Sequence, residues 1–89
     1  MITLNNIKDA RKNLENIAVN TPIAKAPILS KELNAEIFLK KENLQLTGSF
    51  KLRGAFNKVA TLTKEQKDAG VVAASAGNHA QGLAYAAQY

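Results

Sequence analysis

The sequence predicts an α/β fold in which parallel strands are joined by right-handed crossover helices. Two short apolar runs, Glu36–Lys40 and Val71–Ala74, contain the β-branched or aromatic residues that are typical of buried strands. Each run is followed by a segment with the apolar spacing of a helix, so the expected order is strand, helix, strand, helix. A helix that connects two parallel strands almost always crosses over with a right hand.

The first third of the chain is expected to be mostly helical. Thr3 is a suitable N-cap, and apolar residues then recur every three or four positions, which predicts an amphipathic helix that ends near Val19. Pro22 stops this helix, because proline disfavours helical backbone in the residue before it. A short helical turn is predicted at 29–33, with Asn34 as its C-cap.

Three further helices are expected after the first predicted strand. One begins at Ser49 or Phe50, and a short one follows the capping-box pattern at 63–66 and ends at Gly70. The last begins near Asn78. The first of the three is expected to bury one face, formed by Leu52, Ala55, Phe56, Val59 and Leu62.

The composition is that of a globular protein and argues against several classes of partner. The 89 residues are 46% hydrophobic, and their 12 basic and 7 acidic residues give a net charge of +5 that is scattered along the chain. Without a dense basic stripe, nucleic acid is not an expected partner. No apolar stretch approaches the roughly 20 residues needed to span a membrane, and residues 1–9 do not resemble a secretory signal. The absence of cysteine excludes disulfides and thiolate metal sites. We therefore expect a cytoplasmic protein with no metal site.

Residues 1–89 are expected to form only part of a larger domain. Two predicted strands are too few for an independently stable sheet. The last helix reaches Tyr89 without a glycine cap or a proline. Both features predict that the chain is cut at its C-terminal side.

Lys51 is the first candidate site residue. Gly48 and Ser49 place it in the first turn of a helix, where the positive partial charge of the helix N-terminus disfavours a cation. The neutral amine is the form that condenses with an aldehyde. Phe50 offers a flat face to an aromatic ring beside that amine. The alternative is an ordinary exposed lysine, and the residue types alone leave both interpretations open.

The loop Ser75–Gly82 is the second candidate. Its small residues allow close approach to a ligand, and the amides at the start of the following helix form an anion site that suits a carboxylate or phosphate. The alternative is that Ser75 and Asn78 only cap the helix. Gly82 costs about 1 kcal/mol in a helix relative to alanine, which predicts a closely packed neighbour. His79 has no partner at metal-ligand spacing, so a structural role is expected.

The run from Lys41 to Ala55, with Gly-Ser-Phe-Lys at 48–51, closely resembles the cofactor-lysine segment of the serine and threonine dehydratases. These are fold-type II pyridoxal-phosphate enzymes, which are similar in fold to the tryptophan synthase β subunit. The resemblance implies that Lys51 binds pyridoxal 5′-phosphate covalently and that Phe50 packs against the cofactor ring. It also implies a substrate loop in which Asn78 contacts the ring hydroxyl. The amides that would bind the substrate carboxylate belong to Ser75, Ala76, Gly77, Asn78 and His79.

The activity implied by the resemblance is the deamination of L-threonine to 2-oxobutanoate and ammonia, in a homo-oligomeric full-length enzyme. Alternatives on the same fold are an L-serine dehydratase and a serine racemase, and a small binding or interaction domain is the non-enzymatic alternative. Racemases of this family often have a serine where this chain has Ala76, so elimination is expected to dominate. The family's phosphate-binding loop does not occur in these residues. The isolated chain is therefore expected to be inactive and to bind the cofactor weakly, and biosynthetic and catabolic roles both stay open.

Overall fold

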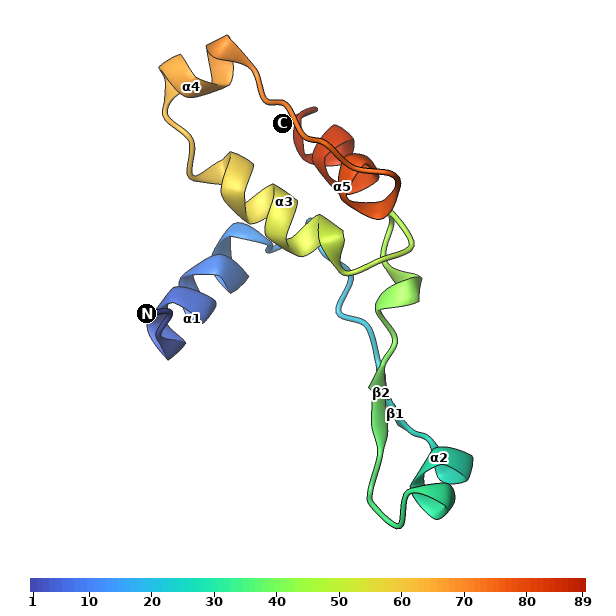
Figure 1. Cartoon of the computed structure of the whole chain (residues 1–89). Coiled ribbons are helices and arrows are strands. Elements are labelled where there is room, and N and C mark those ends of the chain that lie inside the picture. The colour runs from blue at the N-terminus through green and yellow to red at the C-terminus, as the bar shows by residue number, and fades with distance from the viewer.

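The computed structural model describes all residues, 1–89, and consists of helices with one small two-stranded sheet (Figure 1). None of the helices is both long and apolar enough to cross a membrane. The elements follow in the order α1 (Leu4–Asn13), β1 (Ile23–Lys25), α2 (Pro27–Glu32), β2 (Phe38–Lys40), the 3-10 helix η1 (Glu42–Leu44), α3 (Lys51–Ala60), α4 (Lys64–Ala69) and α5 (Asn78–Ala86).

The core lies between α3 and α5, which pack side by side (Figure 1). Apolar residues recur at three- and four-residue spacing in α3, so they form one buried stripe that faces α5. The predicted buried face is confirmed for all its members except Leu62, which is half-buried. The side chains that fill this core are Leu52, Ala55, Phe56, Val59 and Ala86.

The strands differ from the prediction of parallel pairing. The one sheet is an antiparallel ribbon of β1 and β2, in which Ala24 pairs with Leu39, and α2 connects the two strands. The sequence does not predict a strand at Ile23–Lys25, because three residues between two prolines are too few to show a pattern. β2, for which the sequence predicts burial, is exposed along its length. Val71–Ala74 forms no strand, because no other segment of residues 1–89 lies beside it to accept its backbone hydrogen bonds.

The ribbon and α2 form an arm that projects from the helical body (Figure 1). The molecule is accordingly elongated, with extents of 52 × 31 × 25 Å. The site considered below lies in the body, where α3 and α5 meet.

Helix ends agree with the prediction where a side chain or a glycine sets them. Thr3 caps α1 in a capping box with Asn6, and Thr63 does the same for α4 with Gln66. The exception is the end of α1, which stops at Asn13 and not near Val19. The cause is a left-handed backbone conformation three residues later, since Asn16 has a φ of 63°.

Candidate functional site

Lys51 is the first residue of α3, as the sequence predicts. The preceding residue, Phe50, is the N-cap, and the Lys51 Nζ lies 5.3 Å from the centroid of its ring. The side chain is exposed, and none of the ion pairs in the structure includes it. Lys51 therefore presents an accessible amine beside an aromatic ring, with no carboxylate to hold it elsewhere.

The start of α5 offers free backbone amides. Its N-cap is Gly77, which has no capping side chain, and Ser75 Oγ instead accepts a hydrogen bond of 3.2 Å from the Gly77 amide. The amides of Asn78, His79 and Ala80 have no hydrogen-bond acceptor. The alternative interpretation, in which Ser75 and Asn78 cap the helix, is therefore wrong. Three donors at a helix N-terminus favour an anion.

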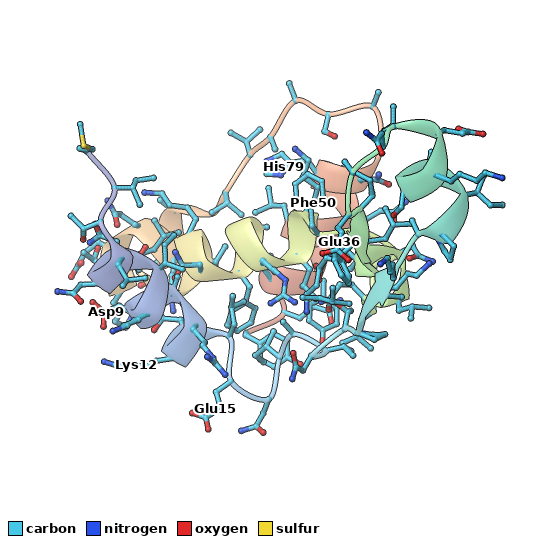
Figure 2. All side chains as sticks on the ribbon, turned by 90° about the horizontal axis from the view of Figure 1, so that it is seen from below. Asp9, Lys12, Glu15, Glu36, Phe50 and His79 are labelled. Carbon is cyan, nitrogen blue, oxygen red and sulfur yellow. The ribbon has the colours of Figure 1, made fainter.

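Gly82 brings these two segments together. A Cβ atom at this position would lie 3.0 Å from the carbonyl carbon of Lys51 and 3.1 Å from the backbone nitrogen of Leu52. The close neighbour that the sequence predicts is thus the backbone of α3 at Lys51 itself. Figure 1 shows the start of α5 beside the loop that enters α3, and Figure 2 shows Phe50 and His79 on the same side of this helix pair.

A polar network that the sequence analysis does not identify lies beside Lys51. The guanidinium of Arg53 donates to both carboxylate oxygens of Glu42, from Nε at 2.8 Å and from Nη2 at 2.9 Å. Thr21 Oγ1 donates to the same carboxylate at 2.6 Å, and Gln45 Nε2 donates to it at 3.2 Å. Gln45 also accepts from the amide of Val19 at 2.9 Å and donates to its carbonyl at 2.8 Å. The only sequence signal for this network is that three of its members lie within the 41–55 segment.

The network keeps Glu42 ionised. Hydrogen bonds from Arg53 lower the pKa of the Glu42 carboxyl from 4.5 to about 2, against the opposing effect of burial, with further lowering from Thr21 and Gln45. The same pairing raises the pKa of the Arg53 guanidinium. A shift of this size corresponds to roughly 3 kcal/mol of stabilisation. Because the pKa is depressed in the folded state, this stabilisation is complete above about pH 4.5 and is lost as the pH falls toward 2.

We expect Glu42→Gln to lower the free energy of unfolding at pH 6 by up to about 3 kcal/mol, because the amide cannot hold Arg53 as the carboxylate does. The difference from wild type should shrink toward zero near pH 2. Urea denaturation at several pH values measures it. The matched control is Glu36→Gln, which removes the exposed ion pair with Lys25 and should cost about 1 kcal/mol or less. A pH-independent difference for Glu42→Gln would contradict the prediction.

His79 is half-buried and borders a cavity of about 260 Å³ between α3 and the 71–73 segment. No group of three or more histidine, cysteine or acidic residues is placed to hold a metal ion. The arrangement instead suits an organic cofactor. The Lys51 amine can bond to an aldehyde, the Phe50 ring can lie against an aromatic ring, and the α5 amides can bind an anion.

Comparison with known proteins gives consistent matches. Residues 14–89 match the family described as pyridoxal-phosphate dependent enzyme. The L-threonine ammonia-lyase of Thermotoga maritima is 58% identical over 88 residues, which are 99% of this chain and 22% of that protein. A biosynthetic L-threonine dehydratase of Corynebacterium glutamicum is 52% identical, over 96% of this chain and 20% of its own length. A catabolic L-threonine dehydratase of Staphylococcus aureus is 47% identical, over 99% and 26%. The chain thus spans about a fifth to a quarter of these relatives.

Solved structures agree with the sequence matches. Serine racemase from Dictyostelium discoideum superposes with a TM-score of 0.88 and 42% identity, over 98% of this chain and 29% of that one. The threonine deaminase of T.th. superposes with a TM-score of 0.81 and 40% identity, over 98% and 31%. The predicted fold class, part of a fold-type II pyridoxal-phosphate enzyme, is confirmed by these superpositions.

Proposed function

We propose, from the premise that this chain belongs to the family of pyridoxal-phosphate dependent enzymes, that it forms the N-terminal part of the catalytic domain of an L-threonine ammonia-lyase. The whole enzyme would convert L-threonine into 2-oxobutanoate and ammonia. The observation that carries this proposal is the contact of Gly82 with the backbone at Lys51, which holds a free amine next to the free amides of α5.

Lys51 and Phe50 would hold the cofactor, the first through a covalent bond from Nζ and the second by packing against the ring. Asn78 would contact the ring hydroxyl. Pyridoxal phosphate, when bound, withdraws electrons from the Cα atom of an amino acid. Lys51 Nζ would then accept the Cα proton and the β-hydroxyl would leave.

The substrate carboxylate would lie on the backbone amides of 75–79. Those of Asn78 and His79 are free in the structure, whereas that of Gly77 donates to Ser75 Oγ. A substrate carboxylate would therefore compete with Ser75 for the Gly77 amide. Amides at a helix N-terminus stabilise a negative charge and fix the orientation of the group that carries it.

The direct test is an assay of the whole protein, the full polypeptide that contains these residues, with L-threonine, L-serine and D-serine. Formation of 2-oxobutanoate from L-threonine, at a higher kcat/KM than deamination of L-serine, supports the proposal. Preferred deamination of L-serine would make the enzyme a serine dehydratase, and interconversion of L- and D-serine would make it a racemase. No reaction with any of these amino acids, and no binding of the cofactor, would favour the non-enzymatic binding domain.

We expect the isolated 89-residue chain to be inactive and to bind pyridoxal phosphate weakly, since residues that would hold the phosphate are not among those described above. Titration with the cofactor should give no visible absorption band. An intense band that disappears in Lys51→Ala would contradict this expectation.

Ala76 is expected to favour elimination over racemisation, because a methyl group cannot donate a proton. Its side chain is exposed, so Ala76→Ser should leave folding unchanged. We expect this substitution in the whole protein to increase the ratio of racemisation to elimination with L-serine, measured by chiral chromatography. Appreciable racemisation by the wild-type protein would count against the assigned role of this position.

The setting of the enzyme is also part of the proposal. We propose that the whole protein is a cytoplasmic homo-oligomer whose substrate is a free amino acid. Its relatives include both biosynthetic and catabolic threonine dehydratases, so isoleucine synthesis and threonine breakdown are both compatible with the site. Gel filtration of the whole protein tests the oligomer.

A further inference from the structure

We infer that Glu42 is a positioning residue for Lys51. By holding Arg53, it fixes the first turn of α3 in the orientation that presents the Lys51 amine to the cofactor. The inference rests on the proposed function, because it concerns the same amine.

The contact acts on α3 itself. Arg53 follows Lys51 by two residues, which is a rotation of about 200° around a helix, so Arg53 points away from the side that carries the amine. Its two hydrogen bonds to Glu42 are in a bidentate arrangement that fixes orientation as well as distance. Glu42 can therefore hold the helix start without covering Lys51.

Glu42 is itself anchored. The Glu42 side chain is only 15% exposed, and Thr21 and Gln45, which both donate to it, are 3% and 4% exposed. Arg53 Nη2 adds a hydrogen bond of 3.2 Å to the carbonyl of Val19. The carboxylate thus connects α3 to the segment before β1 through groups that have little freedom to move.

The first turn of α3 is consequently held from two directions. Gly82 of α5 lies against the backbone of Lys51, and Glu42 holds the helix through Arg53. The residues in between include Gly48, whose φ of 70° is easy only for glycine, and Phe50, whose side chain is 60% exposed. Without Glu42, only the α5 contact would restrain the turn that carries the amine.

The experiment uses the whole protein without cofactor and compares wild type, Glu42→Gln and Glu36→Gln. Glu36→Gln is the matched control, since it makes the same carboxylate-to-amide change in the exposed pair with Lys25. Two quantities are measured at a temperature where all variants are folded. The first is hydrogen exchange of the amides in 45–53. The second is the rate at which added pyridoxal phosphate becomes covalently attached to Lys51, read from its visible absorption and from borohydride trapping.

We expect Glu42→Gln to raise exchange in 45–53 and to slow attachment about tenfold, while exchange in 55–60 and the KM for L-threonine change less than twofold. Glu36→Gln should behave as wild type. Attachment within twofold of wild type in Glu42→Gln, or faster exchange over all of α3, would overturn the inference. If Glu42→Gln does not fold, Arg53→Lys, which keeps the charge but loses the bidentate geometry, provides the same comparison. Failure of the wild-type protein to attach the cofactor would overturn the proposed function instead.

Discussion

Lys51→Ala is expected to abolish turnover of L-threonine in the whole protein, with a loss of about 10³-fold or more in kcat. The alanine side chain can neither bond to the cofactor nor accept the Cα proton. The visible absorption of the bound cofactor should disappear as well. Lys51→Arg should be equally inactive, because a guanidinium keeps the charge but does not condense with an aldehyde.

The fold should tolerate this change. Lys51 is exposed and makes no ion pair, and loss of a cation from a helix N-terminus offsets the lost contact with Phe50. The free energy of unfolding should therefore change by no more than about 0.5 kcal/mol. Lys58→Ala is the matched control, an exposed lysine in the last turn of the same helix, and should stay active and yellow. A yellow, fully active Lys51→Ala protein would refute the assignment of this residue.

Gly82→Ala is expected to destabilise the protein, although alanine is the better helix former. The new Cβ would lie about 3.0 Å from backbone atoms of Lys51 and Leu52, which cannot move aside as the end of a flexible side chain can. Overpacking of this kind costs about 1–3 kcal/mol, against a gain of about 1 kcal/mol in helix propensity. We expect a net loss of about 1 kcal/mol and weaker attachment of the cofactor, because α3 has to shift at Lys51.

Gly54→Ala is the control for this prediction. It makes the same substitution inside α3, where a Cβ would meet no atom within 4 Å, so it should stabilise the protein by about 0.5–1 kcal/mol. Urea denaturation of the two variants separates packing from propensity. Equal stability of Gly82→Ala and Gly54→Ala would show that α5 does not lie tightly against α3.

The correctly predicted parts of the fold depend on neighbours in sequence. The start of α3 near Phe50 and the capping box at Thr63 are set by residues within one turn, so the sequence reports them directly. The strands are predicted less well because pairing depends on distant segments. Nothing in Val71–Ala74 indicates whether a partner strand lies beside it.

The same distinction applies to the site. The cost of a glycine within α5 predicts that something lies close to Gly82, but not that it is the backbone of Lys51, 31 positions earlier. The pair of Glu42 and Arg53 depends on the path of the chain through η1, and ion pairs eleven residues apart leave no periodic pattern. The Lys51 segment is identified through its resemblance to a family, since a single lysine is usually an ordinary surface residue.

The exposed Ser75 and Ala76 side chains have a consequence for how such proteins diverge. They precede α5 and contribute nothing to the core, whereas the neighbouring helix pair tolerates almost no extra volume. Mutations in this short stretch can therefore alter the reaction outcome without loss of foldability. Lyases and racemases could accordingly be separated by very few changes on one unchanged scaffold.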